Sequence, residues 1–139
     1  MKNIFNLTVI TAVFVLLVLG CGKSGGGSTT SGPAADEKPI AVGAKTLTKE
    51  YDENELAADG KYKGKLLAVT GKITDIAETL GNVTVQMEGH NMVVTVMCSF
   101  DESQKGAVSR LKKGQTAIMT GTGDGSTGGL YVGLEKCRL

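Results

Sequence analysis

The periodicity of apolar residues changes at Lys65, and this change restricts the fold more than any other feature of the chain. Beyond it, apolar residues recur at every second position, as in β-strands with one buried face. Gly71 and the broken alternation at Ile76 indicate a bulge that bends the first strand around a small barrel. Three strands are predicted, the last two joined by a turn at residues 89–91. Their inward-facing residues are expected to be Leu67, Val69, Gly71 and Ile73 in the first strand, Val83, Val85 and Met87 in the second, and Val94, Val96, Cys98 and Phe100 in the third.

Two helices and two further strands are predicted around these three strands. The first helix covers residues 47–59, between an N-cap at Thr46 and a stop at Gly60, with Leu47, Tyr51, Asn54 and Ala58 on one face. Leu56 points away from this face, so either the helix is covered on two sides or its end frays. The second helix spans about ten residues from Asp101, which forms a capping-box variant with Gln104. The fourth and fifth strands cover 115–121 and 130–137, with a mobile turn over 124–129.

Three strands, one helix and two strands within about 75 residues is the layout of the OB-fold, a five-stranded Greek-key barrel, so the predicted class is mainly β. The chain also resembles the tRNA_anti-like family of bacterial OB-fold lipoproteins. The resemblance covers most of residues 46–139 and implies an architecture more than an activity. It rests on Glu50-Tyr51, Asn54-Glu55, Ala58, Tyr62 to Lys65, Val69 to Lys72, Cys98 to Phe100, Leu111 to Gln115 and Val132 to Cys137.

Residues 1–20 have the pattern of a secretory signal peptide. Lys2 precedes an apolar run over 4–19, which is shorter than the roughly twenty apolar residues of a stable membrane span. The run ends in Val18-Leu19-Gly20-Cys21, which resembles the bacterial lipobox, where a lipoprotein signal peptidase cleaves before a cysteine that carries diacylglycerol. The resemblance implies that Cys21 is the acylated first residue and that its acyl chains, palmitate among them, anchor the protein in a membrane. The alternative is an ordinary signal peptide with an incidental cysteine.

Residues 21–43 are expected to be a flexible tether in front of a folded domain over 44–139. The stretch from Gly22 to Pro39 lacks periodic apolar residues and cannot offset the entropy of ordering. Such a tether keeps the domain near the membrane. Gly22 stands where an Asp retains lipoproteins in the inner membrane of some two-membrane bacteria, so the outer membrane, facing the periplasm, is favoured.

The charge balance disfavours a general polyanion binder. Fifteen Lys+Arg and fourteen Asp+Glu give a net charge of +1, and removal of the leader with Lys2 leaves the mature chain neutral. OB-folds usually bind along their second and third strands, where the outward side chains here include no aromatic ring for base stacking. No Lys or Arg lies between Lys72 and Lys105, and this stretch would repel phosphates through Asp75, Glu78, Glu88, Asp101 and Glu102.

The basic residues gather instead at the start of the first strand. This group either is a solvated charged edge or binds a polyanion or lipid headgroups. The candidate ligand-binding residues are these lysines and three residues of the later strands: Lys61, Lys63, Lys65, Lys72, Gln86, Thr95 and Tyr131.

Cys98 and Cys137 remain once Cys21 is acylated, and leftover thiols of an exported chain usually pair. In an OB barrel the third and fifth strands are parallel neighbours, and both cysteines lie near the ends of these strands. A disulfide would close a loop of about 40 residues and contribute roughly 4 kcal/mol. Cys137 has the opposite parity to Val132 and Leu134, so it faces inward only if the strand end bulges; the alternative is two buried free thiols.

Catalytic and metal-binding motifs are scarce. His90 is the single histidine and is expected to be exposed in a turn, which argues against a His-based enzyme or a His-rich zinc site. The glycines between Gly121 and Gly129 precede no helix and therefore do not predict a phosphate cradle, and Asp124 lacks further acids at calcium-loop spacing. Tyr51, Tyr62 and Tyr131 are expected in core or rim packing.

We therefore expect no enzyme, no cofactor and no metal. The predicted function is that of a lipid-anchored envelope protein whose OB-fold is a binding or structural module, with a protein, peptide or saccharide partner. The alternative is an OB-fold that binds nucleic acid or another polyanion through the lysines from Lys61 to Lys72, and the charge pattern disfavours it.

Overall fold

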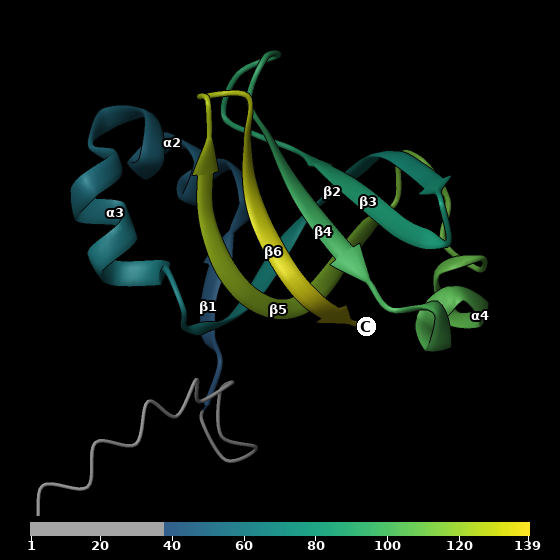
Figure 1. Cartoon of the computed structure of the whole chain (residues 1–139). Helices are drawn as coiled ribbons and strands as arrows, with labels where there is room; N and C mark the ends of the chain where they lie inside the picture. Colours follow the sequence, from purple (N-terminus) through teal and green to yellow (C-terminus); the bar gives the residue numbers. More distant parts are fainter. Residues whose placement is uncertain (1–37) are drawn as a thin grey trace, which may run out of the picture. The chain divides into compact units, whose positions relative to one another are not determined.

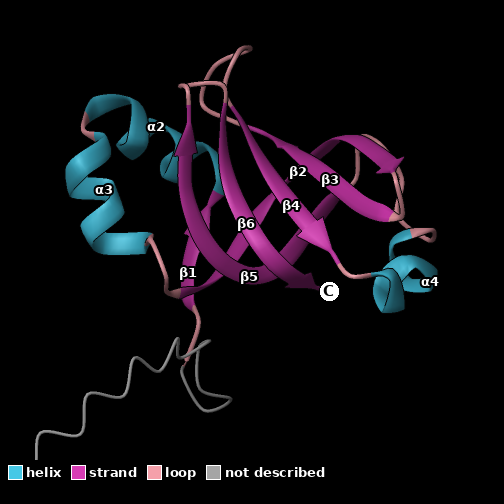
Figure 2. Cartoon of the chain, in the orientation of Figure 1, coloured by secondary structure: helices cyan, strands magenta, loops and turns pink. Residues whose placement is uncertain are grey.

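The computed structural model describes residues 38–139, so the predictions for the signal peptide, for Cys21 and for most of the tether lie outside the described residues. The described part forms one six-stranded sheet with the order β1-β2-β3-β4-β6-β5, which pairing of β2 with β5 closes into a barrel (Figure 2). This is the mainly β OB-fold that the sequence predicts. The strands are β1 (Ile40–Gly43), β2 (Leu66–Thr79), β3 (Asn82–Glu88), β4 (Thr95–Phe100), β5 (Thr116–Thr127) and β6 (Tyr131–Arg138).

The interior of the barrel is filled from the alternating positions of these strands. Apart from Gly71, which is half-buried, every inward residue predicted for the first three strands is buried. The intervening side chains of β3 and β4, from Thr84 to Glu88 and from Thr95 to Ser99, are half-exposed on the outer face. The two-residue period therefore assigned both faces of these strands correctly.

β2 changes partners along its length because of the predicted bulge. Its first half pairs with β5, its second half pairs with β3, and the register with β3 shifts between Ile73 and Asp75. Gly71 does not form this bulge. A Cβ at Gly71 would lie 2.8 Å from Cβ of Ala44 and 2.9 Å from Sδ of Met87, so glycine is needed there for close approach of the helix that follows β1.

β1 corrects the predicted start of the folded domain at residue 44. Ile40–Gly43 pairs in parallel with residues 67–70 of β2 and thereby belongs to the sheet rather than to the tether. A four-residue strand directly after Pro39 has too short a pattern to be predicted, and its partner lies 27 positions further along the chain, at Ile40↔Leu67.

The predicted helix over 47–59 is two helices, α2 (Ala44–Glu53) and α3 (Glu55–Tyr62). Asn54 separates them: its extended backbone ends α2, and its side-chain oxygen accepts a hydrogen bond from the backbone N–H of Ala57 at 3.1 Å to cap α3. Thr46 and Gly60, predicted as cap and stop, both lie inside helices. The break leaves Leu56 exposed at the start of α3, which is neither of the two arrangements expected for it.

The helix predicted from Asp101 is shorter than expected. A single 3₁₀ turn, η1 (Glu102–Gln104), leads into α4 (Lys105–Val108), and the Asp101 side chain makes no capping hydrogen bond. Gly106 within α4 lowers its intrinsic helix propensity. Val108 is the one buried residue of η1 and α4.

The two groups of helices lie on opposite sides of the barrel (Figure 1). α2 contacts β1, β2, β3, β4 and β6, so it covers an open end of the barrel, and it buries Ala44, Leu47, Thr48 and Tyr51 there. α4 lies on the far side. β1 enters at the bottom of the view, whereas the β3–β4 loop (89–94) and the β5–β6 turn (128–130) lie together at the top.

β5 is longer than predicted, because most of the expected mobile turn over 124–129 is strand up to Thr127. Gly128 and Gly129, which have positive φ and open space around them, form the turn, whereas Gly123 in the strand is needed for close packing. A Cβ at Gly123 would lie 2.4 Å from the carbonyl oxygen of Tyr62, so only glycine lets β5 pass the end of α3.

Candidate functional site

The candidate site is a groove of about 600 Å³ on the outer face of β2, β3 and β4, next to the β3–β4 loop. It joins two of the candidate residues, Gln86 of β3 and Thr95 of β4. Tyr131, the third candidate on the later strands, pairs with Thr95 in the β4–β6 ladder but does not line the groove. The full lining is Thr74, Asp75, Gln86, Glu88, Gly89, His90, Asn91, Met92 and Thr95.

Both carboxylates of the groove are paired with lysines from outside its lining. Lys45 Nζ lies 2.8 Å from Glu88 Oε1, and Lys113 binds Asp75. These contacts hold the pKa of Glu88 and of Asp75 below their usual range. Because its two carboxylates already pair with lysines, the groove presents mainly amide, hydroxyl and backbone groups to a ligand, together with the exposed Met92.

The four lysines of the predicted basic group do not form a single free patch. Lys61 Nζ lies 2.7 Å from Glu50 Oε2 and 4.8 Å from the centre of the Tyr62 ring, and Lys63 Nζ lies 3.7 Å from Asp59. Lys65 Nζ donates to the carbonyl oxygen of Gly60 at 3.3 Å. None of the four lines the groove.

Lys72 is separated from the other three lysines. It lies seven positions beyond Lys65, a distance of about 20 Å along an extended strand, and pairs with Thr116 of β5. Its charge contributes, after that of Lys45, to the lowered pKa of Glu88. This arrangement favours the interpretation of the lysines as a solvated edge whose charges are paired within the protein, rather than as a continuous surface for a polyanion.

The β3–β4 loop is fixed to α2 by contacts that the sequence does not indicate. The backbone N–H of His90 donates to Thr48 Oγ1 at 2.8 Å, and His90 Nδ1 lies 3.3 Å from the same oxygen. The prediction of an exposed His90 is therefore wrong, because its side chain is only 18 % exposed between the loop and α2. Thr48 and His90 are 42 positions apart, so no local pattern could have joined them.

Thr48, His90 and Asp52 have the residue types of a nucleophile–base–acid triad, with His90 Nε2 at 3.3 Å from Asp52 Oδ2. The geometry does not support catalysis. Thr48 is completely buried, donates its hydroxyl proton to the Ala44 carbonyl at 2.9 Å and receives the His90 N–H. Its oxygen is therefore a structural link, inaccessible to a substrate.

Tyr51 of α2 and Tyr62 of α3 are buried in the core, as predicted, with ring centres 6.3 Å apart. Burial raises the pKa of both phenols, and for Tyr51 the nearby Asp59 carboxylate adds to this effect. The Tyr51 hydroxyl and Asp59 Oδ1 are buried without a partner in hydrogen-bonding geometry. Tyr131 is half-buried at the start of β6.

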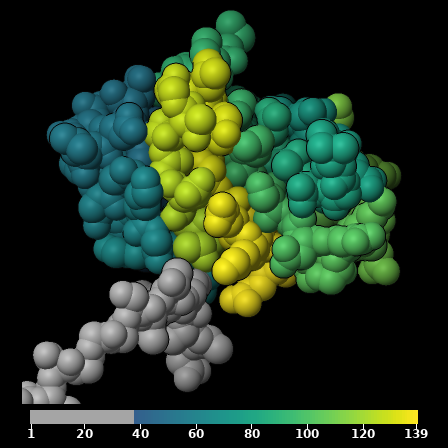
Figure 3. All heavy atoms as spheres, viewed as in Figure 1, coloured from purple at the N-terminus to yellow at the C-terminus, as the bar shows by residue number. Residues whose placement is uncertain are grey.

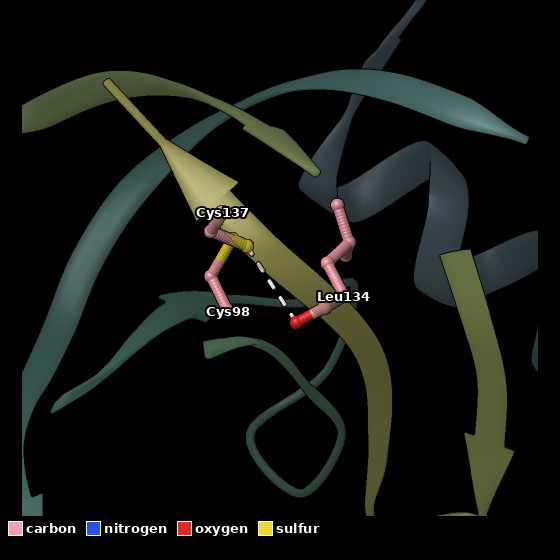
Figure 4. The surroundings of a disulfide bond; sticks show 3 residues. All are labelled: Cys98, Leu134 and Cys137. Atoms are coloured by element: carbon pink, nitrogen blue, oxygen red, sulfur yellow. Dashed lines mark hydrogen bonds between the residues drawn. A yellow bond between two sulfur atoms is a disulfide. The ribbon is translucent and has the colours of Figure 1, made fainter. Parts of the chain in front are cut away.

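Cys98 and Cys137 form a disulfide, with Cα atoms 5.9 Å apart, that joins the parallel strands β4 and β6 (Figure 4). The predicted bulge is present: Lys136 has φ of 51°, and the β4–β6 register shifts so that Phe100 pairs with Cys137. Cys137 Sγ lies 3.5 Å from the Leu134 carbonyl oxygen. Because a disulfide sulfur carries no hydrogen, this is a packing contact between buried atoms and not a hydrogen bond.

Within residues 38–139, no helix is long and apolar enough to cross a bilayer. The same part of the chain contains no group of three or more His, Cys, Asp or Glu side chains that could hold a metal ion.

The comparison with protein families agrees with this architecture. The tRNA_anti-like family model matches residues 1–137. The chain belongs to this family. Among curated proteins no sequence matches it.

A solved structure shares the fold of this tRNA_anti-like protein. It is a crystal structure of a proposed nucleic acid-binding lipoprotein from Klebsiella pneumoniae subsp. pneumoniae, with 18 % sequence identity and a TM-score of 0.61. The match covers 72 % of this chain and 90 % of that one. At this identity the likeness concerns the barrel and not its ligand.

Proposed function

We propose that this tRNA_anti-like protein is a lipid-anchored, non-enzymatic binding module of the bacterial envelope. The groove on β2, β3 and β4 carries the proposal, because it lies on the face where OB-folds bind their ligands and its charged groups are already paired. We infer that the groove takes an uncharged polar segment, either a peptide or a saccharide of the envelope. Gln86 and Thr95 would supply side-chain hydrogen bonds to it.

The anchor is supported by the lipobox resemblance around Cys21 and by the lipoprotein identity of the solved structure with the same fold. Mass spectrometry of the protein purified from its own cells tests it. An acylated amino terminus at Cys21 is expected, and a Cys21→Ser variant should leave the membrane fraction. An intact leader would overturn the anchoring. Gly22 after Cys21 favours the outer membrane, and fractionation of the two membranes tests this.

The ligand is tested by screening the full chain against arrays of uncharged peptides and of envelope glycans. Gln86→Ala and Thr95→Ala should each weaken the best binder by about tenfold, as expected for loss of a hydrogen bond in a desolvated groove. Thr84→Ala is the matched control, since Thr84 lies two positions from Gln86 on the same face but outside the groove lining. Equal losses of affinity in Gln86→Ala and Thr84→Ala would show that the groove is not the binding site.

Nucleic-acid binding is the second candidate, favoured by the description of the Klebsiella protein as a proposed nucleic acid-binding lipoprotein. It would have to use lysines that already pair with Glu50 and Asp59. An oligonucleotide titration at low salt decides: binding that falls steeply with salt, and is lost in a Lys61→Gln/Lys63→Gln variant, would favour this candidate. Absence of binding at low salt would eliminate it.

A further inference from the structure

Three large apolar side chains are exposed together at the end of the barrel opposite the entry of β1. They are Met92 and Val93 of the β3–β4 loop and Leu130 of the β5–β6 turn, with exposed fractions of 102 %, 67 % and 59 %. We call these residues the apolar tip. In Figure 3 the β3–β4 loop projects above the surrounding surface, next to the β5–β6 turn. Single exposed apolar residues are ordinary, but a group displayed on two adjoining loops marks an interaction surface.

The apolar tip is held in one conformation by its own hydrogen bonds. Asn91 Oδ1 accepts the backbone N–H groups of Val93 at 2.9 Å and of Val94 at 2.7 Å. The N–H of Thr95 donates to the Leu130 carbonyl at 3.2 Å and so joins the two loops. With His90 tied to Thr48, the tip is pre-organised, which lowers the entropic cost of binding.

An acidic cleft of about 220 Å³ borders the apolar tip. It lies between the α2–α3 junction and the β5–β6 turn, and Val94 and Gly129, next to tip residues, are part of its wall. Its carboxylates are Asp52, Glu53 and Glu55, which we call the acidic rim, and no Lys or Arg lines the cleft. Two of these acids have a basic neighbour: Lys49 Nζ lies 3.6 Å from Glu53 and His90 Nε2 lies 3.3 Å from Asp52, and the carboxylate side chains of both pairs are more than 60 % exposed.

We propose that the apolar tip and the acidic rim together are a docking surface for a basic segment of a partner protein that also carries apolar side chains. The charge of the rim selects this occupant, because it repels nucleic acid and anionic lipid and attracts Lys and Arg. The tip supplies the apolar contact area of an interface core, and the rim its polar border. This surface differs from the proposed groove, although Met92 lies at the boundary of both.

The test uses the full chain in nonionic detergent with three photoreactive peptides. One repeats Leu-Lys-Lys-Leu, one repeats Leu-Glu-Glu-Leu, and one repeats Ser-Lys-Lys-Ser. Mass spectrometry then locates the cross-links on the protein, which separates docking from partition of the peptide into micelles. The basic apolar peptide should cross-link at Val93 and Leu130, and the other two should not.

Variants decide whether the surface is responsible. Val93→Ser/Leu130→Ser should lower the affinity for the basic apolar peptide about tenfold or more, and Glu53→Gln/Glu55→Gln should lower it several-fold. Leu80→Ser, which changes an even more exposed apolar residue on the β2–β3 turn, and Glu102→Gln are the matched controls and should change nothing. Gln86→Ala leaves the tip intact, so its effect distinguishes failure of the groove from failure of the tip.

Three results would overturn the proposal: equal cross-linking of the acidic peptide, cross-links concentrated away from the tip and rim, or equal losses in the control variants. A concentration-dependent dimer in sedimentation that Val93→Ser/Leu130→Ser abolishes would also overturn it. In that case a second copy of this chain would be the occupant of the surface.

Discussion

The two sides of the barrel are closed by different means. On one side, α2 covers the barrel with Leu47, Thr48 and Tyr51, all buried, and Thr48 binds the adjoining loop. On the other side, η1 and α4 contribute a single buried residue, Val108. The disulfide between Cys98 and Cys137 links the strand ends β4 and β6 toward that second side (Figure 1).

The side that carries the proposed docking surface is therefore stabilised by apolar burial, and the opposite side by a covalent bond. The ten-residue amphipathic helix α2 stabilises its side through burial and also fixes the β3–β4 loop, which carries Met92 and Val93 of the apolar tip. A very short helix cannot do this, so a covalent bond holds the second side together. Apolar burial and chain cross-linking are two independent contributions, and each can be removed separately.

The largest expected effect is loss of the disulfide. A Cys98→Ala/Cys137→Ala variant should lose roughly 4 kcal/mol of unfolding free energy in urea, because the bond closes a long loop, with the two cysteines 39 positions apart. Hydrogen exchange should accelerate first at the ends of β4 and β6. A loss spread equally over α2 would break the contrast between the two sides.

The next largest effect is expected from removal of a buried side chain of α2. Leu47→Ala should cost about 3 kcal/mol, because a completely buried leucine leaves a cavity. Val108→Ala on the opposite side removes fewer atoms and should cost about 2 kcal/mol. Leu56→Ala is the control and should change the unfolding midpoint little, since Leu56 is 86 % exposed. A greater cost for Val108→Ala than for Leu47→Ala would reverse the comparison.

The hydrogen bond between α2 and the β3–β4 loop can be removed with little change in the shape of the side chain. Thr48→Val deprives the His90 N–H of its acceptor and should cost about 1–2 kcal/mol. Two results specific to this contact are expected: the backbone amide of His90 should exchange faster than in the wild type, and the basic apolar peptide should bind more weakly. Thr46→Val, an exposed position of the same helix, should leave both measurements unchanged.

The smallest expected effect sharpens the contrast between buried and surface contacts on the α2 side. The hydrogen bond from Lys61 lowers the pKa of Glu50, so this pair stabilises the fold above the ordinary glutamate pKa, and the contribution is lost as pH falls through the lowered value. Glu50→Gln should therefore reduce the unfolding free energy slightly at neutral pH and not at low pH. The pair is partly exposed, so the difference should be well below that of Thr48→Val.

Local patterns predicted the parts of the protein that depend on near neighbours in the sequence. The two-residue period from Leu67 to Phe100 assigned the inward faces of β2, β3 and β4 and, with the following helix and strands, the barrel topology. The two cysteines left on parallel neighbouring strands predicted the disulfide, and the parity of Cys137 made the bond depend on a bulge, which is present. Gln86 and Thr95 were placed on the outer face by the same alternation, which is why they meet in the groove.

Long-range contacts decided the rest. β1 exists because β2 offers it a backbone edge, and Lys61 is paired with Glu50, 11 positions away, because α3 packs against α2. The fixed loop beneath the apolar tip needs Thr48 and His90 in contact across 42 positions. Side-chain periodicity specifies which face of a strand is buried, whereas pairing of distant charges and loops depends on how the closed barrel folds back on itself.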